Sequence, residues 1–362
     1  MSNELSAVPC RPCNSVCVVG PNPALNVSGG VATHLRILSS LDVFSDAVFC
    51  DVGSRNGPRK ASVLEIFRGY SDLHRQCKSV GFVLTNGSIS AGSLFKVCLQ
   101  LLFLQRKRGR SVFVFFHGGN FEKLGYAGRA SVALLKALQH RVDSFYFLTE
   151  VQRRSFLKKF GESPTRRYRN FSDSDITLPA IAHGNVCNLL YVGRITEAKG
   201  VFESLEALEI LLKRMPGRLR LVFVGDGDAV SELRNRVQGA LETAVEFKGY
   251  LQGAALEHEY QCADLVLLPS EHEGFPYVFI EAMRAGAPMV ATRVGALPEL
   301  IESGENGYLV EKDKDSLVDA IQSYIESDLG CREKMRENCY ACFRETLGRR
   351  SAEVFYSNLL NQ

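Results

Sequence analysis

Residues 270–292 read Ser-Glu-His-Glu-Gly-Phe-Pro-Tyr-Val-Phe-Ile-Glu-Ala-Met-Arg-Ala-Gly-Ala-Pro-Met-Val-Ala-Thr. A short apolar run at 264–268 leads into the glycine loop of this stretch, and a second run at 288–292 closes it. Pro276 suits the first turn of a helix between the two runs, because proline lacks an N–H that would be unbonded there anyway. Strand, glycine loop, helix and strand in this order predict one unit of a parallel α/β sheet.

The same alternation extends outward over the whole chain and predicts α/β architecture, with two doubly wound, Rossmann-like domains. Two such domains that face each other form a cleft at the carboxyl ends of their strands, where ligands bind in this architecture. Helices are expected in the first half at 31–41, 92–108, 126–139 and 150–160. Strands are expected at 15–20, 81–84, 111–116 and 143–148, then at 188–193, 219–225, 244–249, 264–268 and 288–292.

The polar stretch 171–180 has the character of a linker, and 362 residues are more than one compact core usually holds. We predict an N-terminal domain at 1–175 and a C-terminal domain at 176–345. A C-terminal helix at 346–362 is expected to pack back towards the N-terminal domain.

The charge of the chain is unevenly spread. Residues 1–175 contain 24 Lys and Arg against 12 Asp and Glu, a net +12, whereas the remainder carries a net −9. A basic half attracts anionic lipid, phosphorylated substrates or nucleic acid, although a solvated face without a partner has the same composition.

The N-terminus has neither a basic n-region nor an apolar h-region, so no secretory signal is readable and we expect a cytoplasmic protein. The 11 cysteines follow no disulfide or zinc spacing, which fits reduced thiols. Two Cys-x-x-Cys pairs, one beginning at Cys10 and one at Cys339, lack a partner pair at zinc-finger spacing. We therefore expect no metal at either.

Two cations lie on one loop after the strand expected at 188–193. Arg194 and Lys199 are five residues apart in Arg-Ile-Thr-Glu-Ala-Lys-Gly. The planar guanidinium of an arginine and the compact ammonium of a lysine are complementary partners for a diphosphate. Two solvated surface charges would give the same sequence pattern.

Two carboxylates follow in the quoted stretch. Glu273 precedes the expected helix and Glu281 lies about one and a half turns into it, so both can reach one cleft at different depths. Carboxylate oxygens accept hydrogen bonds from sugar hydroxyls, and the helix N-terminus between them suits an anionic diphosphate.

A glycine pair in the first half of the chain is a further candidate site. Gly29 and Gly30 lead into a helix after the first strand, where they either let a phosphate approach the backbone or serve only as a turn.

Residues 188–310 resemble the donor domain of the retaining family-4 glycosyltransferases, which share the two-domain GT-B architecture. The N-terminal half is more loosely similar through Gly29-Gly-Val and His117-Gly-Gly-Asn-Phe. The motifs that carry the donor-domain resemblance are Gly193-Arg-(x4)-Lys-Gly200, Gly225-Asp-Gly227, Glu273-(x7)-Glu281, Ala285-Gly-Ala-Pro288, Val294-Gly-Ala-Leu-Pro-Glu299 and Asn306-Gly307.

The resemblance implies roles for these residues. Arg194 and Lys199 would hold the donor diphosphate, Glu273 the sugar hydroxyls and Glu281 the nucleotide ribose. Asp226 and Asp228 mimic a metal-binding pair, but this position is a turn in the family, so no metal is expected. The other implied positions are donor contacts at Gly29, Gly30, Gly274 and Phe275, base contacts at Tyr250 and Leu251, a catalytic residue near the reacting sugar at His117, and acceptor-side contacts at Asn120, Thr149 and Glu150.

The implied activity is metal-independent, retaining transfer of a hexosyl unit from a nucleoside diphosphate sugar to an acceptor hydroxyl. The acceptor would be a glycan or a lipid-linked glycan in bacterial surface polysaccharide or glycolipid assembly, and no nucleic acid is involved. The alternatives are a nucleotide-sugar epimerase or phosphorylase on the same fold, or a catalytically silent binding protein. The sequence leaves the sugar, the base and the acceptor open.

Residues 94–110 combine an apolar run with a terminal basic cluster, as an interfacial helix does. A helix that packs on a Rossmann sheet has a similar pattern. Together with the basic N-terminal half, the pattern favours peripheral, salt-sensitive binding to the cytoplasmic face of an anionic membrane.

Overall fold

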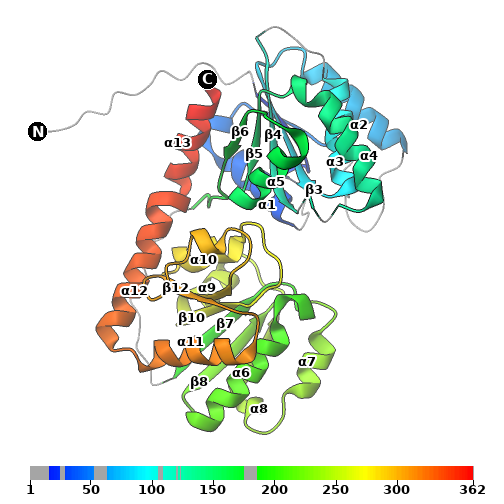
Figure 1. The fold of residues 1–362 in the computed structure, drawn as a ribbon. Coiled ribbons are helices and arrows are strands. Elements are labelled where there is room, and N and C mark those ends of the chain that lie inside the picture. Colours follow the sequence, from blue (N-terminus) through cyan, green and yellow to red (C-terminus); the bar gives the residue numbers. More distant parts are fainter. Residues whose placement is uncertain are drawn as a thin grey trace, which may run out of the picture. The chain divides into compact units, whose positions relative to one another are not determined.

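The computed structural model describes residues 16–24, 29–52, 63–104, 109–119, 121–122, 124–174 and 186–361. The chain forms two compact units, each with its own parallel sheet (Figure 1). The first unit comprises Met1–Tyr168 and Ala352–Gln362, and the second comprises Arg169–Ser351. The expected pair of doubly wound α/β domains is confirmed.

The unit boundaries differ from the predicted ones at 175 and 345. Asn170 is buried in the second unit and its Nδ2 donates a hydrogen bond to the Phe275 carbonyl at 2.8 Å. The Ser172 N–H likewise donates to the Leu347 carbonyl at 2.8 Å. The start of the expected linker is therefore packed structure of the second unit. The second division falls within the last helix, after Ser351, rather than at its start.

The first unit has a six-stranded sheet in the order β2-β1-β3-β4-β5-β6, and every neighbouring pair is parallel. Helices α2, α3 and α4 lie side by side over this sheet (Figure 1). The strands are β1 (Val16–Val19), β2 (Val48–Cys50), β3 (Phe82–Ile89), β4 (Ser111–Gly119), β5 (Ser144–Phe147) and β6 (Thr165–Arg167). The α-helices are α1 (Gly30–Ser40), α2 (Val63–Gln76), α3 (Ala91–Phe103), α4 (Tyr126–Leu138), α5 (Glu150–Phe160) and the end of α13 (Arg349–Leu360).

Strand β4 shows why this sheet forms. Its residues Val112–Phe116 are all buried, as expected for a central parallel strand with helices over both faces. Phenylalanines dominate the core here: Phe116, Phe145 and Phe156 are at most 1% exposed. Helix α3 ends at Phe103, with Leu104 extended as its C-cap, so the expected helix at 92–108 is too long. The basic residues expected at its end, 106–108, lie outside the described residues.

The second unit has a six-stranded parallel sheet in the order β12-β11-β10-β7-β8-β9. Helix α6 packs against α11, whereas α10 packs against α9 and α12 (Figure 1). The strands are β7 (Cys187–Val192), β8 (Leu219–Val224), β9 (Val245–Gly249), β10 (Leu265–Leu268), β11 (Met289–Thr292) and β12 (Gly307–Val310). The helices are α6 (Val201–Arg214), α7 (Val230–Arg236), α8 (Leu241–Ala244), α9 (Ala254–Cys262), α10 (Tyr277–Arg284), α11 (Lys314–Glu326), α12 (Leu329–Cys342) and the start of α13, with 3-10 turns η3 (Glu197–Lys199) and η4 (Leu297–Glu299).

Side chains that alternate along β7 and β8 pack beneath α6 and α11 to form the core of this unit, including Leu189, Tyr191 and Phe223. Among the described residues, no helix has both the length and the apolarity needed to cross a bilayer.

Candidate functional site

The carboxyl ends of β7 and β10 mark the point where the strand order of the second sheet reverses. From β7 the chain runs through β8 to β9 on one side, and it then forms β10, β11 and β12 on the other. Open α/β sheets bind ligands at such a reversal. The loops after these two strands, with helix α10, carry the predicted donor residues Arg194, Lys199, Glu273 and Glu281.

Gly200 brings the two loops together. Its φ of 72° is left-handed, and a Cβ there would lie 2.2 Å from the Pro269 carbonyl oxygen at the end of β10. Only glycine permits this approach. The Glu271 N–H also donates to the Ala198 carbonyl at 2.9 Å. Lys199 is thereby held beside the loop that contains Glu273.

Lys199 and Glu273 form an ion pair. Lys199 Nζ lies 2.5 Å from Glu273 Oε1, and the two side chains are 21% and 12% exposed. The structure therefore brings together the cation predicted for the diphosphate and the carboxylate predicted for the sugar. In this pair each group neutralises the other, so a phosphate that binds Lys199 competes with Glu273.

Arg194 differs from Lys199 in its surroundings. Its side chain is exposed and forms no ion pair with any described residue. Its carbonyl accepts a hydrogen bond from Tyr191 Oη at 2.8 Å. Burial raises the pKa of Tyr191, the Glu273 charge raises it further, and the Arg194 charge opposes both. The buried Tyr191 thus lies near the charges of both Arg194 and Glu273.

The backbone of the glycine loop is clamped by Gly295. Gly295 has a φ of 61°, and a Cβ there would lie 2.4 Å from the carbonyl oxygens of both Glu273 and Gly274. The Ala296 N–H donates to the Gly274 carbonyl at 2.8 Å. Phe275 is buried, so its side chain belongs to the core rather than to a free binding surface. Helix α10 begins directly afterwards, at Tyr277, so Pro276 occupies the N-cap position and not the first turn.

Glu281 lies on α10 and is half-buried. Its Oε2 accepts a hydrogen bond from Tyr260 Oη at 2.6 Å. Burial raises the pKa of Glu281, whereas the Tyr260 hydrogen bond and the Arg284 charge lower it. Burial and the Glu281 charge together hold the pKa of Tyr260 well above its usual range, so Tyr260 remains a hydrogen-bond donor.

The predicted base contacts lie at the end of the edge strand β9. Tyr250 is 69% exposed, and Leu251 is partly exposed. The Gly225 N–H donates to the Gly249 carbonyl at 2.7 Å, which ties the ends of β8 and β9 together. An exposed aromatic ring at a strand end can stack on a planar base.

The described residues contain no cluster of three or more metal-ligating side chains. Asp226 Oδ1 accepts a hydrogen bond from the Gly227 N–H at 2.8 Å and so stabilises a turn. A Cβ at Gly227 would lie 2.2 Å from the Ile195 carbonyl oxygen, so this turn packs against the Arg194 loop. Cys339 lies buried on α12, and Cys10 is outside the described residues.

The glycine pair of the first unit starts helix α1. Gly29 is the N-cap with a φ of 126°, and Gly30 is the first helical residue. A Cβ at either position would meet no described atom within 4 Å. Among the described residues, no atom therefore requires glycine at either position, apart from the positive φ of Gly29.

His117 lies at the end of β4 with both ring nitrogens bonded. Asn86 Oδ1 lies 2.8 Å from Nε2, and Tyr168 Oη lies 2.9 Å from Nδ1. Asn86 Nδ2 donates to the Val19 carbonyl, so Oδ1 is the acceptor for an N–H at His117 Nε2. Burial and the neighbouring His34 hold the pKa of His117 well below its usual range. His117 is thus a neutral, fixed imidazole.

The acceptor-side candidates have local roles. Thr149 Oγ1 caps α5 by accepting from the Gln152 N–H at 3.1 Å. Hydrogen bonds from Arg153, supported by Arg154, lower the pKa of Glu150 to about 2. Glu150 is therefore charged, but it is already paired with arginines of its own helix. Asn120 lies outside the described residues.

The sequence interpretation missed Tyr260, Asn86 and Tyr168, which orient predicted site residues. Asn86 has a usable signal, because it follows the expected strand 81–84 closely, and polar residues at the carboxyl end of a parallel strand are candidates for a site. Tyr260 has no such signal, since a tyrosine on an apolar helix face is usually plain core.

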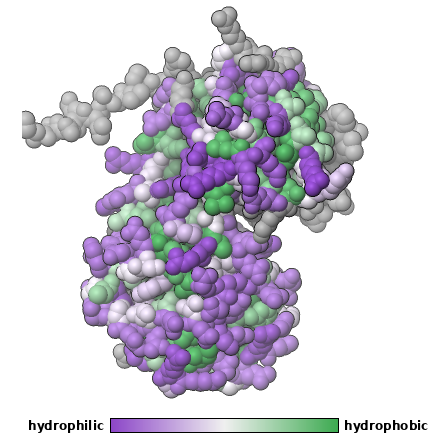
Figure 2. All heavy atoms as spheres, in the orientation of Figure 1, coloured by the Kyte–Doolittle hydropathy of each residue, from purple (hydrophilic) through white to green (hydrophobic). Residues whose placement is uncertain are grey.

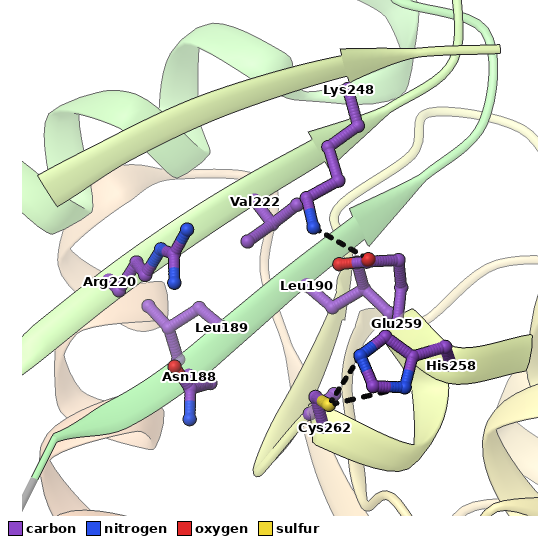
Figure 3. Close-up of a pocket in the computed structure, with 10 residues that line it drawn as sticks. Asn188, Leu189, Leu190, Arg220, Val222, Lys248, His258, Glu259 and Cys262 are labelled. Carbon is purple, nitrogen blue, oxygen red and sulfur yellow. Dashed lines mark hydrogen bonds and ion pairs between the residues drawn. The ribbon is translucent and has the colours of Figure 1, made fainter. Parts of the chain in front are cut away.

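A pocket of about 130 Å³ lies elsewhere in the second unit (Figure 3). Asn188 and Arg220 line it at the amino ends of β7 and β8, opposite the ends that carry the donor residues. Across it, Lys248 Nζ pairs with Glu259 Oε1 at 2.6 Å. None of the residues predicted to bind the donor is among those that line this pocket.

The sequence of the second unit is similar to that of a known protein family. The sequence profile described as Glycosyl transferases group 1 matches residues 185–341. An uncharacterized glycosyltransferase of Methanocaldococcus jannaschii is 36% identical over 152 residues, which cover 41% of this chain and 38% of the relative. The amylovoran biosynthesis glycosyltransferase AmsK of Erwinia amylovora is 34% identical over 128 residues, which cover 33% of this chain and 31% of the relative. The chain thus spans well under half of either relative.

The crystal structure of Anabaena HepE in complex with UDP is similar in fold to this chain. It matches with a TM-score of 0.76 and 19% identity, and the match covers 96% of this chain and 99% of HepE. At this identity the likeness shows the fold, which agrees with the two parallel sheets described above. The chain therefore has the GT-B fold, and residues 185–341 of its second unit are similar to the glycosyl transferases group 1 family.

Proposed function

We propose that this chain is a retaining glycosyltransferase that moves a hexosyl unit from a nucleoside diphosphate sugar to an acceptor hydroxyl. The observation that carries the proposal is the Lys199–Glu273 pair at 2.5 Å, on the two loops where the strand order reverses. A cation for phosphate and a carboxylate for hydroxyls lie side by side there, as a sugar diphosphate requires. Complexes of HepE with UDP and with UDP-glucose support this donor class.

Each donor residue has a role in this proposal. Arg194 and Lys199 bind the diphosphate, with the N-terminus of α10 adding backbone N–H groups and positive potential. Glu273 binds sugar hydroxyls and Glu281 the ribose. Gly274 keeps the backbone open to the sugar, while Tyr250 and Leu251 cover the base.

The transfer breaks the bond between the anomeric carbon and the phosphate oxygen and forms a bond to the acceptor oxygen on the same face. The acceptor proton passes to the leaving phosphate oxygen. Arg194, Lys199 and the helix N-terminus stabilise the charge that develops on the diphosphate, which makes a divalent metal unnecessary. This contribution is electrostatic, and the proposal includes no protein nucleophile.

The first unit binds the acceptor in this proposal. His117, which lies at the end of β4, and Asn120 are assigned to the acceptor side. Gly29 and Gly30, at the start of α1, contact the donor in this proposal. Thr149 and Glu150 shape the neighbouring helix start. The acceptor class is a glycan or lipid-linked glycan of a bacterial surface polysaccharide or glycolipid, which the amylovoran biosynthesis relative supports.

Product analysis tests the proposal. The protein is incubated with UDP-, GDP- and ADP-linked hexoses and lipid-linked glycan acceptors, and the anomeric configuration of the product is read by NMR. We expect one donor to yield a product with the donor's configuration. An inverted product contradicts retention. Donor binding without any product favours a silent binding protein, and a changed nucleotide sugar favours an epimerase.

We also propose that helix α3 contacts the cytoplasmic face of an anionic membrane. Phe95, Leu99 and Leu102 recur at helical spacing, and Phe95 and Leu102 are 48% and 46% exposed. Exposed Lys96 and Arg129 lie on α3 and its neighbour α4. Figure 2 shows apolar side chains among hydrophilic ones on the surface of this unit. Basic residues near an anionic surface contribute about 1 kcal/mol each.

Vesicle co-sedimentation tests the membrane proposal. The protein should pellet with anionic but not with neutral liposomes, less so in high salt. Phe95→Ser with Leu102→Ser should reduce pelleting. Val151→Ser, at a 65% exposed position on α5, is the matched control and should not. Equal partitioning to both lipids, or none to either, refutes the membrane contact and leaves the donor site unaffected.

A further inference from the structure

Tyr260 is a buried residue of α9 that reaches the candidate nucleotide site only through another side chain. It is 1% exposed, and its hydroxyl donates to Glu281 Oε2 at 2.6 Å. Within the described part of the chain, Glu281 Oε1 accepts no hydrogen bond. One carboxylate oxygen is therefore fixed by the protein and the other is left for a ligand.

We propose that Tyr260 is a positioning residue, which fixes the Glu281 carboxylate so that its second oxygen accepts from the ribose hydroxyls of the donor. This inference rests on the proposed function. A carboxylate on a helix can rotate about its side-chain bonds, and a short bond to a buried, rigid phenol removes that freedom. The donor then binds to an acceptor that is already oriented.

A second contact holds the two helices that carry this pair. Arg336 of α12 is 4% exposed, and its guanidinium donates to the carbonyls of Ala263 and Ala285, at the ends of α9 and α10. A cation at helix C-termini is favoured by the helix dipole. Arg336 thus fixes the spacing of α9 and α10, on which the Tyr260–Glu281 distance depends.

The charge state of Glu281 gives a readout that a packing defect would not produce. The groups that act on its carboxyl are Tyr260 on α9 and Arg284 on α10, and both favour the charged form against burial. Arg336 on α12 is engaged with carbonyl oxygens. Loss of the Tyr260 hydroxyl should therefore raise the pKa of Glu281.

The test compares Tyr260→Phe with wild type. Tyr324→Phe is the matched control, since Tyr324 is a buried tyrosine of the same unit on α11, 2% exposed. The Glu281 carboxyl is titrated by ¹³C NMR in the ligand-free protein, with Glu281→Gln to assign its signal. Binding of UDP, GDP and ADP is measured by calorimetry across pH 5 to 8.

Tyr260→Phe should titrate Glu281 at higher pH, weaken nucleotide binding roughly tenfold, and move the acid limb of binding to higher pH. Tyr324→Phe should change neither. An unchanged Glu281 titration, or weaker binding with an unmoved acid limb, overturns the inference alone. If wild type binds none of the three nucleotides, the proposed function fails together with this inference.

Discussion

Replacing Glu273 by glutamine should separate the phosphate and sugar roles of the donor site. Lys199 Nζ is bonded to Glu273 Oε1 in the ligand-free protein, so a nucleoside diphosphate must compete with this carboxylate. Glutamine keeps the shape but removes the charge. We expect Glu273→Gln to bind UDP, GDP or ADP at least as tightly as wild type, while transfer of the sugar falls.

The magnitude follows from the burial of the pair. With 21% and 12% of the side chains exposed, the pair lies between a surface ion pair and a buried one. Exposed pairs are worth about 0 to 1 kcal/mol, and this pair is screened less by solvent. Releasing Lys199 should therefore favour the diphosphate by about 1 kcal/mol, or roughly fivefold. Lys199→Met removes the phosphate contact itself, worth about 1.5 to 3 kcal/mol, and should weaken binding from about tenfold to over a hundredfold.

Calorimetry with the three nucleoside diphosphates, without sugar, measures both effects. Glu209→Gln is the matched control, because Glu209 pairs with Lys213 at 2.8 Å on the exposed face of α6. That variant should bind as wild type does. The reasoning is refuted if Glu273→Gln loses affinity as strongly as Lys199→Met, since Glu273 would then build the phosphate site rather than compete with it.

Three further predictions follow. Arg194→Met should weaken donor binding by about tenfold to over a hundredfold. Because Arg194 is exposed and unpaired among the described residues, the variant should change the unfolding free energy by less than about 0.5 kcal/mol. A large drop in the melting temperature would instead assign Arg194 a structural role. Transfer should survive EDTA, and loss of activity that magnesium or manganese restores would contradict the diphosphate account. The pKa of His117 is lowered in the folded protein from its usual 6.5, so His117 gains a proton in the unfolded chain first, and the free energy of unfolding should fall as the pH drops below that value. Urea unfolding at about pH 5 to 7.5 should show a smaller fall of this free energy in His117→Asn than in wild type, and an identical fall would contradict the buried, neutral imidazole.

Much of the fold follows from local patterns in the sequence. Central strands such as β4 and β10 are predicted because burial on both faces makes them continuous apolar runs. The edge strands β2, β6 and β12 are missed, since they are short and partly exposed: in β6, Thr165–Arg167, no residue is buried. Helix α2 is missed as well.

The donor site is predicted as a set of residues, but not as a set of contacts. Spacing along the loops indicates Lys199 and Glu273, while their ion pair depends on Gly200 packing against the end of β10, a contact between distant segments. The dependence of Glu281 on Tyr260 is hidden for the same reason. The first unit ends at Tyr168 rather than at 175, because Asn170 and Ser172 find hydrogen-bond partners in the second unit.

Binding of intact nucleoside diphosphate sugars tests the central claim most directly. Wild type and the double variant Arg194→Met with Lys199→Met are titrated calorimetrically with UDP-, GDP- and ADP-linked hexoses, and circular dichroism verifies that both are folded. We predict saturable binding of one such donor to wild type, at one site per chain, and its loss in the double variant. Absence of binding to wild type, or equal binding by the folded double variant, would contradict the account.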